Sequence, residues 1–161
     1  TSEWTRAAGD AAASPAVDEI DALAALSGER VTVLVWRQAD AWWADSDGAA
    51  MESAQISLVI DHLPFSGAAM VRHYRIDGEY SNAYQAWVRM GSPANPSAAQ
   101  IAYLKGRQGL EQLEPPAMRL VSAQRRLALE FAMPMFGVSL LEIEPANPTS
   151  SPELMSVAKE D

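Results

Sequence analysis

The stretch from Val71 to Gln100, VRHYRIDGEYSNAYQAWVRMGSPANPSAAQ, decides the fold, because it passes from a strand through a turn into two helices. Val71 to Ile76 alternates with the period of a pleated strand, and neither of its faces is purely apolar. Asp77-Gly78 then signals a turn, since Asp can bond its own following backbone and Gly adopts positive φ without steric cost. The strand therefore ends at a polar corner.

A short helix is expected after this corner. Ser81 or Asn82 can cap it. Tyr84, Trp87 and Val88 then fall at spacings of three and four, which gives the helix an aromatic face. We expect that face to pack against a sheet, with Tyr84 and Trp87 as part of the contact.

A second helix is expected beyond a loop that contains two prolines. Gly91 ends the first helix, and Pro93 and Pro96 hold the loop extended, because each disfavours the helical region for the residue before it. Ser97 to Gln100 is typical of a capping box that opens the next helix.

The composition indicates one globular domain. The chain has 161 residues, of which 48% are hydrophobic and 20% charged, so it can bury a core without a metal or a disulfide. A net charge of -9 argues against nucleic acid or an anionic membrane as partners, because the phosphate attraction would have the wrong sign. No apolar run approaches the length of a membrane span, and the N-terminus lacks a signal-peptide layout, so the chain is expected to begin within a longer protein. The compartment stays open.

Metal and thiol chemistry find no support in the sequence. The chain contains no Cys, which excludes disulfides, thiolate catalysis and Cys-ligated zinc. Its two histidines, His62 and His73, lie apart in sequence without a cluster of carboxylates, so we assign no metal ligand and no cofactor.

Short strands separated by turn signals are expected through the rest of the chain. Arg30 to Arg37 is the strongest, because it is rich in β-branched residues and apolar on both faces, and we expect both faces to be covered. The other candidates are Gln55 to Asp61, Met118 to Ala123, Arg126 to Phe131 and Phe136 to Ile143. Without βαβ alternation, this pattern predicts an all-β fold, an antiparallel β-sandwich of the immunoglobulin-like two-sheet kind with a short helical insertion.

Three segments follow from these signals. Residues 1–29 form a linker and docking segment, in which Val17 to Leu26 has apolar and acidic residues at helical spacing. Residues 30–145 form the β-sandwich, with the helical insertion at 78–110, and residues 146–161 form a C-terminal tail.

The order of four sequence runs resembles a known family. HYRID at 73–77, SNAYQAW at 81–87 and MGSPANPSAAQ at 90–100 are followed by FGVSLLEIEP at 136–145. Together they resemble the C-terminal β-sandwich domain of family 39 glycoside hydrolases, the β-xylosidases and, more distantly, the α-L-iduronidases. The resemblance covers most of the chain, and HYRID and SNAY match the xylosidase form more closely. It implies an accessory domain that packs on a catalytic (β/α)8 barrel of the same polypeptide, without a cofactor.

No catalytic residue is assigned in this chain. Retaining hydrolysis of a glycoside needs two carboxyl groups about 5 to 5.5 Å apart across the scissile bond. The resemblance places both on the barrel, for which this chain has no room. Glu142 and Glu144 lie in a strand that ends at Pro145, and we expect them at solvent-facing or edge positions.

A polar set near the corner has two interpretations. His73 and Arg75 share a strand face, with Asp77 beside them, so they can form a structural network that braces the corner. The same residues can instead contact the barrel or the rim of its active site. The candidate set for docking or for the pocket rim is His73, Arg75, Asp77, Tyr80, Ser81, Asn82 and Tyr84.

Two functions are consistent with the sequence. The first is an accessory domain of a β-xylosidase-like retaining glycoside hydrolase, which releases xylose from the non-reducing end of xylo-oligosaccharides in xylan degradation. Its partner is the catalytic barrel. The alternative is an independent carbohydrate-binding module that binds xylo-oligosaccharides at the domain edge through Trp42 and Trp43, because aromatic faces suit the apolar side of a pyranose. Adjacent residues in a strand point oppositely, which argues against this platform.

Overall fold

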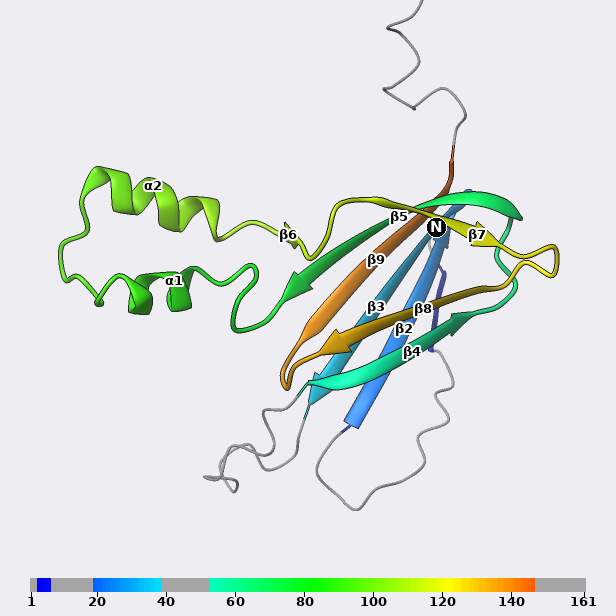
Figure 1. Cartoon of the computed structure of the whole chain (residues 1–161), viewed down its shortest axis with the longest axis horizontal. Coiled ribbons are helices and arrows are strands. Elements are labelled where there is room, and N and C mark those ends of the chain that lie inside the picture. Colours follow the sequence, from blue (N-terminus) through cyan, green and yellow to red (C-terminus); the bar gives the residue numbers. More distant parts are fainter. Residues whose placement is uncertain (1–2, 7–18, 39–52, 147–161) are drawn as a thin grey trace, which may run out of the picture.

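The computed structural model describes residues 3–6, 19–38 and 53–146 (Figure 1). The strands are β1 Glu3–Arg6, β2 Glu19–Ser27, β3 Arg30–Gln38, β4 Ala54–Ile60, β5 Gly67–Ile76, β6 Glu111–Gln112, β7 Ala117–Val121, β8 Leu127–Met133 and β9 Val138–Pro145. The helices are α1 Ala83–Arg89 and α2 Ala98–Gly106. Within these residues no helix is long and apolar enough to cross a membrane.

The strands form two antiparallel sheets. The larger sheet has the order β1-β2-β3-β9-β5-β6, and β7 also pairs with β5. The smaller sheet consists of β4 and β8, and Figure 1 shows it in front of the larger one. The predicted all-β sandwich with a short helical insertion is confirmed.

The core lies between the two sheets. β3 buries every second side chain, as its alternation predicted, and the cross-strand pairs Val33 with Leu141 and Val71 with Ile143 continue this inner face across β9 to β5. The main buried residues that meet there are Val31, Val33, Val35, Ile56, Leu63, Ala69, Val71, Val121, Leu127, Leu129, Met133, Leu141 and Ile143. In contrast to the prediction that both faces of β3 are covered, no described helix or strand packs over its other face.

The helical prediction for Val17 to Leu26 is wrong. Residues 19–27 form β2, which pairs with β3 along its whole length, from Glu19 opposite Gln38 to Ser27 opposite Arg30. Hydrogen bonding to the strongest strand of the chain outweighs the weak local helical spacing. The sandwich therefore includes residues that the sequence assigned to a linker.

The two helices begin where the sequence predicted, but they pack differently. Asn82 caps α1, and Ser97 with Gln100 forms the capping box of α2. Figure 1 shows both helices beyond the end of β5, away from the two sheets. Among the described elements they contact each other and do not cover the sheet, so the predicted helix-on-sheet packing is wrong. We call residues 78–110 the helical projection.

The hairpin between β8 and β9 leaves no room for a larger residue at Gly137. A Cβ atom there would lie 2.8 Å from the Pro134 carbonyl oxygen and 2.9 Å from Met133 Cγ. The same turn is closed by hydrogen bonds from the Gly137 amide to Pro134 and from the Arg37 amide to Gly137.

We therefore expect Gly137→Ala to lower the free energy of unfolding by about 1 to 3 kcal/mol, because backbone must move to accept the methyl group. Urea unfolding measures the change. Gly109→Ala is the control, since nothing lies within 4 Å of a Cβ there, and its effect should stay within about 0.5 kcal/mol. Equal effects of the two substitutions would contradict the crowding.

Candidate functional site

The polar corner that follows β5 is built around Asp77. Its carboxylate accepts hydrogen bonds from the backbone amides of Glu79, at 2.6 Å, and Tyr80, at 2.9 Å. Asn82 donates through Nδ2 to the Asp77 carbonyl at 2.8 Å, and its Oδ1 accepts from the Gln85 amide at 3.0 Å. Asn82 therefore ties the start of α1 to the end of the strand.

Ser81 connects the two ends of the helical projection. It has a φ of 53°, its Oγ donates to the Arg75 carbonyl at 2.6 Å, and the same Oγ accepts from the Glu111 amide at 2.8 Å. The Glu111 carboxylate accepts from the Ser81 amide and, at 2.7 Å, from Arg107. Arg107 also donates to the Glu79 carbonyl. The projection thus leaves and rejoins the sheet through one hydrogen-bonded junction.

The helical projection carries aromatic and aliphatic side chains on its surface, and among its residues only Ala86 is buried. Tyr84 is 66% exposed, and its ring lies 5.9 Å from the ring of Trp87. Trp87 is half-buried and donates through Nε1 to the Pro93 carbonyl at 3.1 Å. Ile101 and Tyr103 on α2 are exposed, and no residue of α2 is buried.

His73 and Arg75 point to the interior. His73 Nε2 lies 2.9 Å from Ser139 Oγ, and the His73 ring meets Phe131 edge-on at 4.7 Å. Arg75 donates to the Ala132 carbonyl at 2.8 Å and pairs with Asp77 at 3.5 Å. Since both side chains are buried between the sheets, this arrangement favours the bracing network over contact with another domain.

The His73–Ser139 pair is not accessible for catalysis. His73 is 3% exposed and Ser139 is fully buried, so no substrate reaches the hydroxyl. Burial and, to a lesser extent, the neighbouring Arg75 charge together lower the pKa of His73 to about 4. The imidazole is therefore neutral at pH 7 and acts as a hydrogen-bonding member of the core.

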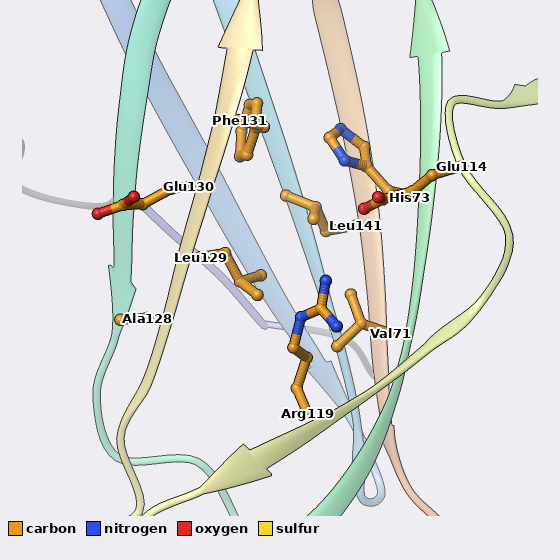
Figure 2. A pocket seen from close by; sticks show the side chains of 9 residues that line it. All are labelled: Val71, His73, Glu114, Arg119, Ala128, Leu129, Glu130, Phe131 and Leu141. Carbon is orange, nitrogen blue, oxygen red and sulfur yellow. The ribbon is translucent and has the colours of Figure 1, made fainter.

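A small cavity lies beside His73, between the two sheets (Figure 2). Its volume is about 90 Å³, whereas sites for small molecules typically measure several hundred. It is lined by Val71, His73, Glu114, Arg119, Ala128, Leu129, Glu130, Phe131 and Leu141. The cavity is too small to enclose a pyranose.

Glu142 and Glu144 lie on the face of the sheet that points away from β4 and β8. Arg72 donates to Glu144 at 2.9 Å, and Arg30 pairs with the same carboxylate. These arginines hold the pKa of Glu144 below its ordinary value, whereas a general acid needs a raised pKa. Tyr74 donates to Glu142 at 3.5 Å. Both glutamates therefore take part in cross-strand pairs.

One predicted feature, the sugar platform, is not addressed by this geometry. Trp42 and Trp43, the candidate sugar platform, lie outside the described residues. In the described part of the chain, no three His, Cys, Asp or Glu side chains gather as metal ligands would.

Sequence reasoning missed the partners from outside the 71–100 stretch. Ser139 and Glu111 had a weak signal each: Ser139 is the polar member of an otherwise apolar alternation, and Glu111 follows the second helix. Neither signal says which strand lies opposite.

Comparison with solved structures places this fold within larger glycosidases. No family model and no curated protein matches the chain. A GH39 enzyme from Xanthomonas axonopodis pv. citri aligns with a TM-score of 0.62 at 20% identity, over 78% of this chain and 26% of its own. A monomeric β-xylosidase from Caulobacter crescentus CB15 aligns with a TM-score of 0.58 at 21% identity, over 78% and 26%.

A bacterial orthologue of human α-L-iduronidase also matches, with a TM-score of 0.59 at 18% identity, over 81% of this chain and 23% of its own. The chain has the fold of one part of the family 39 glycoside hydrolases. It spans about a quarter of the length of these structures, and at such identities the likeness is one of fold.

The buried imidazole predicts a pH-dependent stability. Because the pKa of His73 is about 4 when folded and 6.5 ordinarily, the unfolded chain binds a proton between these values that the folded chain does not. Stability from this group is complete above pH 6.5 and falls by about 3 kcal/mol as the pH drops to 4. Urea unfolding at several pH values measures the slope.

His73→Gln should flatten this slope between pH 6.5 and 4, because the group that titrates is gone. His62→Asn is the control, since His62 is exposed and Asn tolerates its positive φ. An unchanged slope in His73→Gln would show that other groups control the acid sensitivity.

Proposed function

We propose that this chain is the accessory domain of a β-xylosidase-like retaining glycoside hydrolase that acts on xylo-oligosaccharides from the non-reducing end. In this proposal, a catalytic (β/α)8 barrel in the same polypeptide carries both reacting carboxylates, and the chain packs on the barrel and supports it. The fold shared with family 39 enzymes, over about a quarter of their length, supports the proposal.

The helical projection is the observation that carries this proposal. A sandwich does not need a segment of this length between two neighbouring strands, and such insertions are commonly functional. Hydrogen bonds of Ser81, Asn82 and Glu111 close its junction, which holds the projection in one direction. Its helices expose Tyr84, Ile101 and Tyr103, which suits contact with a further surface.

We assign the projection to the rim of the sugar pocket. Asp77, Ser81 and Asn82 position it, since their side chains are used in the junction. Tyr84 makes direct contact, because its ring is largely exposed. Tyr80 lies between these groups in the chain and shares the positioning role through its backbone amide.

The double substitution Tyr84→Ala/Tyr103→Ala in the longer polypeptide tests this role. We expect kcat/KM for a nitrophenyl xyloside to fall about tenfold, which corresponds to about 1.4 kcal/mol, because contacts at the pocket rim are lost. Steady-state kinetics and the melting temperature are measured together. The control is Val59→Ala, an exposed position on the smaller sheet, which should change neither quantity. If the double variant changes neither kcat/KM nor the melting temperature, the role of the projection at the pocket rim is wrong.

The isolated chain should neither bind nor hydrolyse xylo-oligosaccharides. Calorimetric titration with xylobiose and xylohexaose, with a nitrophenyl xyloside assay on the same sample, measures both. We expect neither binding nor hydrolysis, since the described cavity is small and, in this proposal, the reacting carboxylates lie on the barrel. Binding that Trp42→Ala abolishes would support the carbohydrate-binding module instead.

A further inference from the structure

The larger sheet has a second apolar face on the side opposite the core. Cross-strand pairing places Leu34 between Leu23 and Leu140, and Leu140 beside Tyr74. In the adjacent row Trp36 pairs with Val138, which pairs with Ile76. We call these seven residues the outer apolar face: Leu23, Leu34, Trp36, Tyr74, Ile76, Val138 and Leu140.

No described element covers this face. The smaller sheet packs on the opposite side, and the helices contact each other beyond the end of β5. Six of the seven side chains are half-buried, and Ile76 is 45% exposed. Strands that are apolar on both faces are typical of sheets with both faces covered, whereas a sheet with one solvated face shows polar residues there.

Paired charges border the outer apolar face. The next rows contain Glu144, which pairs with both Arg30 and Arg72, and Glu142, which accepts from Tyr74. An apolar centre beside a polar rim is the usual anatomy of a protein–protein interface. Because these charged side chains already pair within the sheet, the surface offers no strong attraction for an ionic ligand.

Two other occupants are less consistent with this surface. A second copy of the chain would bring together two molecules of net charge -9, which repel each other. A sugar needs an exposed ring flanked by free hydrogen-bonding groups, but Trp36 is half-buried between Val138 and Asp21, whose carboxylate already accepts from the Ala22 amide at 2.9 Å. An apolar protein surface is the occupant that matches.

We infer that the outer apolar face is where the remaining domain of the same polypeptide packs. The inference rests on the proposed function, in which that remaining domain is the catalytic one. The similar solved structures have about three quarters of their length outside the part that this chain matches, so a domain of sufficient size is available there. This contact is separate from the helical projection, which leaves the sheet beyond Ile76.

Cysteine labelling tests this inference, because the chain has no Cys of its own. Ile76→Cys and Leu34→Cys report on the edge and the centre of the outer apolar face. Val59→Cys is the matched control, because Val59 is also apolar and β-branched and is 40% exposed, but lies on the smaller sheet. Each variant is made in this chain and in the longer polypeptide, and labelling by a maleimide is followed by mass spectrometry.

In this chain, Ile76→Cys and Val59→Cys should react at similar rates. In the longer polypeptide, Ile76→Cys and Leu34→Cys should each react at least tenfold more slowly than the same variant of this chain. The reaction rate of Val59→Cys should be the same in both. If Ile76→Cys reacts equally fast in both contexts, the inference is overturned, whatever the glycosidase activity. Protection of Ile76→Cys in a longer polypeptide that has no xylosidase activity would support the outer apolar face as the contact with another domain and would overturn the proposed function.

Protection of Ile76→Cys already in this chain, with a dimer in sedimentation, would assign the face to a second copy and overturn the inference.

Ile76→Lys provides an independent measurement. It should lower the melting temperature of the longer polypeptide, because a charge would be buried at the contact. The melting temperature of this chain should change much less. Val59→Lys should change the melting temperature of neither protein. Equal changes in melting temperature for Ile76→Lys in this chain and in the longer polypeptide would also contradict the inference.

Discussion

The antiparallel pairing of β5 with β9 is the constraint on which the other features depend. Its register sets every side chain of β5 to one of two faces, since a slip by one residue would exchange them. Val71, His73 and Arg75 enter the core, while Tyr74 and Ile76 join the outer apolar face. The same strand ends at the corner from which the helical projection departs. One register therefore positions the core, the outer face and the projection together.

The buried polar side chains of β5 find partners on β8, on β9 and at the corner, and only Nε of Arg75 is left without one. Ser139 of β9 faces His73, while the carbonyl of Ala132 in β8 and the Asp77 carboxylate take the Arg75 guanidinium. Burying such groups without partners would cost several kcal/mol. Their arrangement also links the smaller sheet to the corner, since Arg75 bonds to both. The network thus braces the base of the projection from within the sandwich.

The sequence predicted those features that local chemistry decides. The alternation of β3 and the caps at Asn82 and Ser97 depend on neighbours within a few residues, and they are confirmed. Features decided by distant partners were not predictable. The segment of β2 became a strand through pairing with β3, and the Ser139 partner of His73 lies 66 residues away. The helical projection was expected on a sheet because an aromatic helix face suggests a core, but the sequence does not say which surface provides it.

That last error and the outer apolar face have the same physical origin. An amphipathic helix and a sheet that is apolar on both faces each carry more apolar surface than two described sheets can cover. Burying apolar area stabilises by about 25 cal/mol per Å², so a surface of this kind gains free energy from contact with another protein surface. The helical projection extends beyond the end of β5, whereas the outer apolar face lies on the sheet itself, so a small, flat partner would not reach both. A large, folded partner that reaches around the end of β5 can, which is the shape that a catalytic domain of the same polypeptide would need.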